Sequence, residues 1–304
     1  MGTTGSGAGK GLGMGWSVAV LLGVMLVWGT TFPLLKAASA SLSGVEISAV
    51  RFCIAGLCML PFAWGAPRQT WKDGVILGAL ALVSYVAQAF GLEYISSNRS
   101  AFLTALNVLM TPLLGLAFGA SLSLMVLLAA AIACVGIGLM SWEGGAHLLG
   151  DSATVLCALA YALYVIVLSQ RAGRHQPRQL AATQIVLMAV FAVLWVLANG
   201  LVHPEALTTL YARSAGQLPQ LLYLGVIATA GMLFLQAVAQ RNVPADKAAV
   251  IYAMEPVFAA LFGWLWLNEV LTTRAAMGGA LVVGAVILSE LKPSLKAAGA
   301  ERSR

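Results

Sequence analysis

Apolar segments of about 20 residues alternate with short polar breaks along almost the whole chain, and a helix needs about that length to cross a bilayer. Ten segments are long enough, covering approximately residues 16–36, 44–65, 74–94, 99–119, 123–142, 151–170, 179–201, 217–240, 246–267 and 274–291. The longest break between them runs from 201 to 216. The pattern predicts an all-α membrane protein with ten transmembrane helices.

The second half of the chain repeats the polar pattern of the first half at an offset of 148 residues. The scarce polar positions coincide in order: Gln88 with Gln236, Asn98 with Asp246, Arg99 with Lys247, and Asn107 with Glu255. Because each half holds an odd number of predicted helices, the second half must enter the membrane from the opposite side. Inverted repeats of this kind are typical of transporters that expose a midplane site to each side in turn.

We therefore predict two inverted five-helix repeats, the first over residues 16–142 and the second over 150–291. A flexible tail at 1–15 precedes them, and a basic tail at 292–304 follows them. One chain contains both members of the inverted pair, so a monomer suffices.

The composition excludes a soluble domain, because 60% of the residues are hydrophobic and only 9% are charged. Soluble chains carry about 25% charged residues. The net charge of +6 does not indicate nucleic-acid binding, since the basic residues lie in short loops and at the C-terminus. They form no patch interleaved with aromatic residues, and the expected partner is the lipid bilayer.

The basic residues instead predict an orientation. With the N-terminus in the cytoplasm, twelve of the 17 Lys and Arg residues fall on the inner side. Arg99, Arg213 and Arg274 fall on the outer side, and Lys36 and Arg51 lie within or near the first two helices. Cytoplasmic loops carry the excess of Lys and Arg, so both termini are expected in the cytoplasm.

Several short motifs give the chain a family resemblance. The first predicted helix ends in WGTTFP over residues 28–33, the second opens with SAVRF over 48–52, and the ninth holds YAMEP over 252–256. With ten helices in a five-plus-five repeat, the chain resembles the EamA branch of the drug/metabolite transporter superfamily over about residues 16–291. The closest similarity is to bacterial ten-helix exporters of aromatic and neutral amino acids and other metabolites.

This resemblance implies export of a small metabolite, with an amino acid as the expected substrate, across the bacterial inner membrane. Substrates vary widely within the family. One departure is the loop over 119–123, which lacks the Gly-Glu pair often present there, whereas the second half keeps Asn268-Glu269.

Four polar residues at bilayer depth are candidates for a substrate site: Gln88, Asn107, Gln236 and Glu255. Polar side chains at this depth usually face the bundle interior or a water-filled cavity. A pseudo-two-fold axis in the membrane plane would bring all four near the centre, where they could bind a zwitterion. The alternative is interhelical hydrogen bonding, which is worth about 0.6 kcal/mol on average in membranes.

Glu255 has two interpretations. It could bind a substrate ammonium group or take up a coupling proton. Alternatively, Pro256 lacks an N–H and frees the carbonyl of Tyr252, so that a protonated Glu255 would bond the nearby backbone. Pro112 in the fourth helix could mark a comparable break.

Aromatic residues within the predicted spans are the second group of candidates: Trp28, Tyr85, Tyr161, Tyr164 and Tyr252. Tyr161 and Tyr164 are three positions apart and share a helical face. These rings would wall a cavity for an amino-acid side chain, with plain core packing as the alternative.

Lys36 and Arg51, toward the outer ends of the first two helices, could attract an anion at the outer mouth. Arg51 could instead pair with Glu46, although five residues is a poor helical spacing for an ion pair. Small residues in the fifth and tenth helices, including Gly136 and Gly284, predict close packing where the two halves meet.

The remaining reactive residues suggest no catalytic or metal site. The four cysteines lie inside apolar segments without metal-ligand spacing, and the three histidines lie in or beside loops. No nucleotide-binding motif is present, so we expect no cofactor and no ATP drive within this chain. Uptake or exchange of a drug-like or nucleotide-sugar-like solute remains an alternative function, and an intramembrane enzyme is the alternative from another class.

Overall fold

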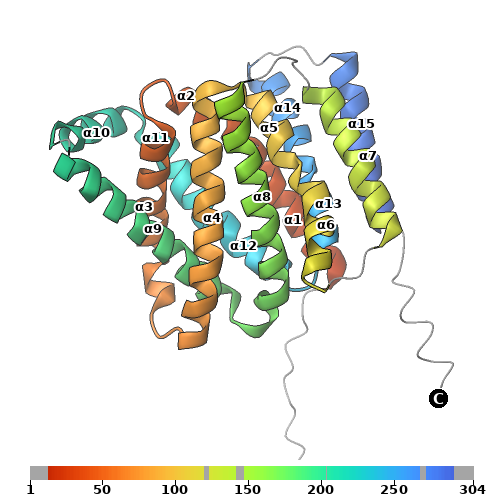
Figure 1. The fold of residues 1–304 in the computed structure, drawn as a ribbon, viewed down its shortest axis with the longest axis horizontal. Coiled ribbons are helices and arrows are strands. Elements are labelled where there is room, and N and C mark those ends of the chain that lie inside the picture. The colour runs from red at the N-terminus through yellow and green to blue at the C-terminus, as the bar shows by residue number, and fades with distance from the viewer. Residues whose placement is uncertain (1–12, 120–122, 142–146, 203, 268–271, 291–304) are drawn as a thin grey trace, which may run out of the picture.

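The structure is a computed structural model of the chain, and it describes residues 13–119, 123–141, 147–202, 204–267 and 272–290. The two tails beyond residues 13 and 290, and the Asn268-Glu269 motif, lie outside the described residues. Every regular element of the described residues is a helix, and most of the helices stand side by side in one bundle (Figure 1).

The helices of the first half are α1 (Met14–Gly29), α2 (Thr31–Ala38), α3 (Gly44–Ala63), α4 (Arg68–Tyr94), α5 (Ser97–Ala105), α6 (Asn107–Ala117) and α7 (Leu124–Ser141). Those of the second half are α8 (Leu148–Arg171), η1 (Ala172–Arg174), α9 (Pro177–Val202), α10 (Pro204–Gly216), α11 (Leu218–Leu222), η2 (Tyr223–Gly231), α12 (Met232–Ala239), α13 (Ala245–Tyr252), α14 (Met254–Leu267) and α15 (Thr273–Glu290). The segment η1 is a 3₁₀-helix, and η2 is a π-helix.

Seven helical segments of the described residues are long and apolar enough to cross a membrane: Met14–Ala38, Gly44–Ala63, Arg68–Tyr94, Arg99–Ala117, Leu148–Arg174, Pro177–Val202 and Leu218–Ala239. Two further apolar helices, Leu124–Met140 and Thr273–Ser289, are shorter. The predicted ninth span forms α13 and α14 with an interruption between them. An all-α, multi-span architecture is thus confirmed, while the count of ten spans stays a prediction.

The longest polar break holds a helix that the hydrophobic pattern did not predict. Helix α10 covers most of the break and packs against α9 at one edge of the bundle (Figure 1). Its Arg213 binds Glu46 at the start of α3, with Nη2 at 2.5 Å from Oε1. The alternative in which Arg51 pairs with Glu46 is therefore not the arrangement in the structure, because Glu46 pairs with a residue 167 positions away.

The two halves pack against each other in reciprocal pairs. Two helices contact their own repeat counterparts: α3 contacts α9, and α7 contacts α15. Other contacts occur in mirrored form, since α4 packs on α8 while its counterpart α12 packs on α1. Two repeats related by a two-fold axis produce this pattern of contacts. The opposite membrane orientation of the two repeats stays a prediction.

Three membrane helices are interrupted near their middle by a tight turn. The interruptions lie at Thr30, Leu106 and Ala253, where the amide bonds the carbonyl three residues back. Pro256 is the third residue of α14, and a proline is tolerated in a first turn because its missing N–H has no partner there anyway. The break expected near Pro112 is misplaced, since Pro112 lies inside α6 and the turn precedes it at Leu106.

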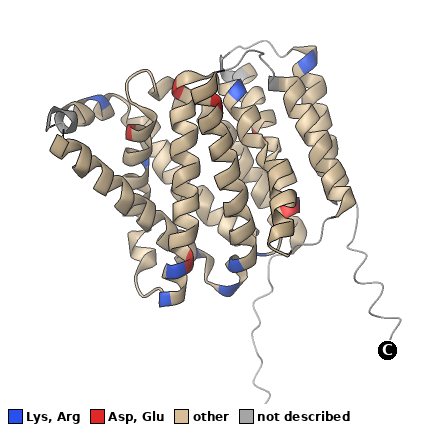
Figure 2. Cartoon of the chain, viewed as in Figure 1, with Lys and Arg blue, Asp and Glu red and all other residues tan. Residues whose placement is uncertain are grey.

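Charges are confined to the two ends of the helices, apart from a few residues at depth (Figure 2). Two ion-pair clusters hold α8 against the first half at opposite ends. Near its start, Asp151 binds Arg99 of α5, with Oδ1 at 2.6 Å from Nε. At its end, Arg171 binds the buried Asp73 of α4, which also lies 2.7 Å from His175 Nε2. These clusters fix both ends of α8 in the present conformation.

Candidate functional site

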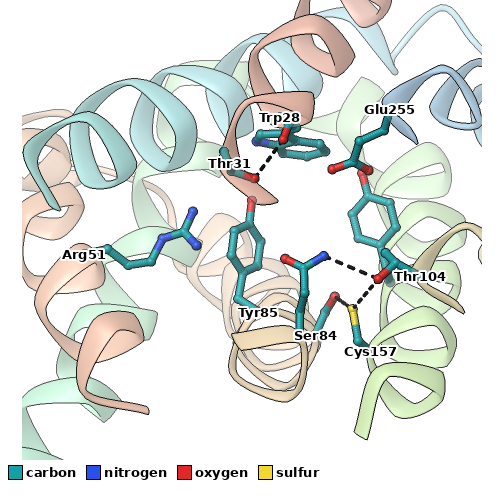
Figure 3. A pocket seen from close by; sticks show the side chains of 10 residues that line it. Trp28, Thr31, Arg51, Ser84, Tyr85, Thr104, Cys157 and Glu255 are labelled. Atoms are coloured by element: carbon teal, nitrogen blue, oxygen red, sulfur yellow. Dashed lines mark hydrogen bonds between the residues drawn. The ribbon is translucent and has the colours of Figure 1, made fainter. Parts of the chain in front are cut away.

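A cavity lies at the centre of the bundle, between α1, α2, α3, α4, α5, α8 and α14 (Figure 3). The space between its walls, including the part open to solvent, is about 400 Å³, and only about 30 Å³ of it can hold the centre of a water molecule. Five of the nine predicted site residues line it: Trp28, Tyr85, Gln88, Tyr161 and Glu255. The other lining residues are Thr31, Arg51, Ser84, Thr104 and Cys157, none of which was predicted to be in the site.

Arg51 is the most consequential of the residues that sequence reasoning missed. Its side chain is only 1% exposed, and its Nε donates a hydrogen bond to Thr229 Oγ1 at 3.1 Å. The guanidinium carbon lies 4.7 Å from the centre of the Tyr85 ring, within cation–π distance. Within the described part of the chain, no carboxylate pairs with it. The sequence signal was its charge at bilayer depth, which we had assigned to the outer mouth.

Glu255 carries the opposite charge at the same cavity. It is the second residue of α14, where the positive end of the helix dipole favours a carboxylate. Figure 3 shows Glu255 and Arg51 on opposite sides of the space, with Tyr85 between them. The structure gives the Glu255 carboxylate no hydrogen bond or ion pair to the described residues, including the backbone near Pro256, where the structural interpretation placed one.

The two repeat-related glutamines make equivalent bonds but face different surroundings. Gln88 Nε2 donates to Thr104 Oγ1 at 3.4 Å, and Gln236 Nε2 donates to Tyr252 Oη at 2.9 Å. Residues 104 and 252 are themselves repeat counterparts at the offset of 148. Gln88 lines the cavity, whereas Gln236 does not.

Gln236 instead belongs to a buried network behind the cavity wall. Its amide also donates to Tyr161 Oη at 3.0 Å, and Tyr252 Oη donates to Gln240 Oε1 at 2.8 Å. Gln240 in turn donates to the carbonyl of Val165 at 2.7 Å. Of this network only Tyr161 reaches the cavity, so Gln236 and Tyr252 act on the site through it.

Asn107 and Tyr164, the other two predicted site residues, also lie outside the cavity lining. Asn107 donates from Nδ2 to the carbonyl of Thr104 at 2.8 Å and so stabilises the turn between α5 and α6. Tyr164 is fully buried and stacks on Tyr161, with ring centres 5.9 Å apart. It supports the cavity wall from behind.

Three aromatic rings form the apolar part of the wall. Trp28 meets Tyr85 and Tyr161 edge-on, with ring centres 6.4 Å and 6.0 Å apart. The Trp28 indole donates from Nε1 to the carbonyl of Ala228 at 2.7 Å, which fixes the plane of the ring. Edge-to-face contacts of this kind hold rings in place while leaving a face free to contact a ligand.

A small hydroxyl–thiol cluster completes the wall beside Gln88. The Cys157 sulfur lies 3.4 Å from Ser84 Oγ and 4.0 Å from Thr104 Oγ1. Cys157 lies inside an apolar segment and is buried, but its thiol also borders the cavity. Among the described residues, no group of three His, Cys, Asp or Glu side chains is arranged to hold a metal ion.

Lys36 stabilises the C-terminal end of α4. Its Nζ donates to the carbonyls of Leu92 and Ile95, at 2.6 Å and 3.0 Å. Those carbonyls lie at the end of α4, where basic side chains commonly satisfy unpaired acceptors. Lys36 does not border the cavity, so the structure gives no support to its predicted role in attracting an anion.

Comparison with known proteins points to one family. A model of the EamA-like transporter family matches the chain twice, over residues 15–142 and 148–291. A protein of Archaeoglobus fulgidus named "Uncharacterized transporter" is 31% identical over 88% of this chain and 84% of its own length. The protein named "Uncharacterized transporter YwfM" of Bacillus subtilis is 26% identical over 94% of this chain and 97% of its own.

A crystal structure with 15% sequence identity has the same fold. It superposes with a TM-score of 0.71 and covers 91% of this chain and 98% of its own.

Proposed function

Because the chain belongs to the EamA-like transporter family, we propose that it exports amino acids or similar small zwitterions across the bacterial inner membrane. The central cavity is the binding site, and alternating access exposes it to the two sides in turn. The observation that carries this proposal is the pair of opposite charges, the buried Arg51 and the partly buried Glu255, that face one cavity without pairing with each other.

The charges of the cavity suit a zwitterion. The Nη groups of Arg51 are free to donate to a carboxylate as a bidentate pair, while Thr229 and Tyr85 hold the rest of the guanidinium. Glu255 can accept from an ammonium group. Each charge carries a desolvation penalty when it has no partner. A zwitterionic ligand would place an opposite charge beside each of them and so offset both penalties.

The aromatic wall and the small volume restrict the ligand further. Trp28, Tyr85 and Tyr161 offer ring faces for an apolar side chain or for a cation. The space is narrow in this conformation, so the walls must move apart to admit even one small metabolite. Among amino acids, those with neutral apolar or aromatic side chains fit this wall best.

The ends of α8 support an alternating-access mechanism. The Asp151–Arg99 pair and the Asp73–Arg171–His175 cluster lie at opposite ends of this helix. Each cluster joins α8 to the first half, and releasing one while keeping the other would open the bundle on one side. Ten spans, inverted repeats and cytoplasmic termini are part of the same proposal, supported by the Lys and Arg bias.

The test is efflux from proteoliposomes loaded with a panel of labelled amino acids. We expect saturable release of some members by the wild-type protein, and loss of that release in Arg51→Gln and Glu255→Gln. Gln184→Ala is the matched control, because Gln184 is a fully buried polar residue of α9 outside the cavity. Retention of the whole panel by a folded protein would overturn the substrate class.

A second observation favours a different solute as the alternative. An apolar groove of about 640 Å³ runs between α3, α4, α8 and α9, and Phe52 lies both in this groove and against Tyr85. A drug-like amphiphile would reach the central cavity from the lipid along this groove. Transport of such a compound by wild-type protein, abolished by Phe52→Ala and accompanied by no amino-acid efflux, would favour this function instead.

A further inference from the structure

The helix that follows α11 departs from α-helical geometry beside the cavity. Residues Tyr223–Gly231 form the π-helix η2, whereas α4, the corresponding helix of the first half, is a continuous α-helix. The amide of Met232 bonds the carbonyl of Ile227, five residues back. The Thr229 hydroxyl likewise donates to the carbonyl of Leu224 at 2.7 Å, also five residues back. Short π-helical stretches inside α-helices are frequent at functional sites.

The π register leaves a carbonyl available to the cavity wall. In an α-helix, the amide of Met232 would bond Ala228, but here it bonds the carbonyls of Ile227 and Thr229 instead. The Ala228 carbonyl accepts the indole N–H of Trp28 at 2.7 Å. A change to the α register would supply a competing donor to this carbonyl and weaken the hold on Trp28.

Thr229 makes the second contact, to Arg51. Its Oγ1 accepts the hydrogen bond from Nε of Arg51 at 3.1 Å while its own proton goes to Leu224. Nε is the one guanidinium nitrogen that the structure bonds to a described residue, so the two Nη groups are left for the cavity. A third contact joins Tyr223 Oη to Thr30 Oγ1 at 2.7 Å, at the break between α1 and α2.

We propose that η2 is the positioning element of the binding site, and that Thr229 sets the orientation in which Arg51 presents its Nη groups to the carboxylate of the substrate. Thr229 does not line the cavity and acts only through Arg51. The proposal rests on the proposed function for the identity of the ligand. The orientation of Arg51 can be measured without that ligand.

The physical reason is the cost of an unsatisfied buried donor. Without the Thr229 acceptor, Nε of Arg51 would lie buried with no partner, and the guanidinium would rotate to bond another oxygen. The substrate carboxylate would then meet a displaced and differently angled pair of Nη groups. Binding should weaken, while the steps that follow binding should change little.

The first measurement is the KM for efflux of a labelled amino acid that the wild-type protein transports, such as phenylalanine. Thr229→Val removes the hydroxyl at nearly constant volume, and we expect it to raise the KM about fivefold to tenfold with little change in maximal rate. Thr229→Ser keeps the hydroxyl and should restore the wild-type KM. A fall in maximal rate at unchanged KM would overturn the positioning role.

The matched control is Thr154→Val. Thr154 is also fully buried in a membrane helix, and its hydroxyl also donates to a backbone carbonyl of its own helix, that of Gly150 at 2.9 Å. It does not line the cavity. If Thr154→Val raises the KM as much as Thr229→Val does, the effect is a general response to losing a buried hydroxyl and the proposal fails.

The second measurement needs no substrate and uses the cavity thiol of Cys157. In a chain with the other three cysteines replaced by serine, the rates of modification by an anionic and a cationic methanethiosulfonate reagent are compared. Arg51 favours the anionic reagent, so Arg51→Gln and Thr229→Val should both lower the ratio of anionic to cationic rates. Thr154→Val should leave this ratio unchanged.

The two measurements separate the two proposals. A lowered ratio in Thr229→Val, together with no amino-acid efflux by the wild-type protein, would keep the positioning role and reject the substrate class. An unchanged ratio in Thr229→Val would overturn the positioning role, whatever the protein transports. The same holds if Arg51→Gln leaves the ratio unchanged.

Discussion

Each half of the molecule contains one of two equivalent glutamine hydrogen bonds. One of them borders the cavity, and the other lies in a closed, buried network. Gln88 bonds Thr104 at the open cavity, whereas Gln236 bonds Tyr252 inside a network closed by Gln240. The repeat therefore preserves a contact between helices while only one copy is available to a ligand. A symmetric scaffold here carries an asymmetric site, and repeat counterparts should respond differently to the same substitution.

The largest difference in the effect of a substitution on transport is expected between Glu255 and its repeat counterpart Asn107. Glu255→Gln removes the partly buried acid that faces the cavity, and gradient-driven efflux should fall about 100-fold, as for loss of a charge-assisted hydrogen bond. If Glu255 also carries a coupling proton, exchange of substrate for substrate should persist. Asn107→Ala alters only the turn after Thr104 and should leave efflux nearly unchanged. Uphill efflux at the wild-type rate in Glu255→Gln would contradict a role in either binding or coupling.

The two glutamines should separate transport from stability. Gln88→Ala removes a cavity residue, and we expect the KM for efflux to rise about tenfold, equivalent to ~1.4 kcal/mol, with little change in the thermal unfolding midpoint. Gln236→Ala breaks the closed network and should lower that midpoint in detergent. Equal losses of stability in the two variants would show that both glutamines are structural.

Two glycines test whether the seam between the halves is equally crowded for both repeats. A methyl group at Gly136 would lie 2.6 Å from the carbonyl of Gly278, whereas its counterpart Gly284 has no neighbour within 4 Å. Gly136→Ala should force α7 and α15 apart and cost about 1–3 kcal/mol. Gly284→Ala should be neutral or slightly stabilising, because alanine favours the helix. Unfolding midpoints in detergent measure both, and a larger loss at Gly284 would contradict the contact geometry.

The smallest difference, in the effect of a substitution on stability, is expected between the repeat counterparts Thr104 and Tyr252. Tyr252→Phe removes a hydroxyl that accepts from Gln236 and donates to Gln240, so stability should fall by about 0.6 kcal/mol for each lost bond. Thr104→Val removes a hydroxyl at the cavity. Water there can accept the hydrogen bond from Gln88 instead, so the unfolding midpoint should barely move. A larger shift for Thr104→Val would indicate that the cavity side is as tightly packed as the network.

Much of the architecture followed from the sequence because bilayer-spanning helices must be long, apolar and separated by polar turns. The two repeats followed from a few polar positions that recur at one offset, and the Gln88–Thr104 and Gln236–Tyr252 bonds occur in that register. The helix α10 escaped prediction because a short helix on one edge of the bundle needs no spanning length. Its Arg213 then took the partner that had been considered for Arg51.

The candidate site was only partly predictable, because residue type indicates depth in the membrane but not which side chains face a cavity. Five residues were found because aromatic and polar groups are scarce at bilayer depth. Gln236 and Tyr252 have the same character but face a network, and no local pattern distinguishes a ring that lines a cavity from one that packs behind it. Ser84, Thr104 and Cys157 are small residues common in packed membrane helices, so they gave no signal.

The sequence by itself determined that this chain is a helical membrane protein with two related halves, because hydrophobic length and repeat register are properties of the chain alone. Only the tertiary structure decided which repeat contributes its glutamine to the cavity, and that Arg51 and Glu255 face one space from opposite walls. It also decided that a π-helical turn holds Trp28 and Arg51 there. These features depend on contacts between residues as many as 200 positions apart, as in the Trp28–Ala228 bond, and no local sequence pattern encodes them.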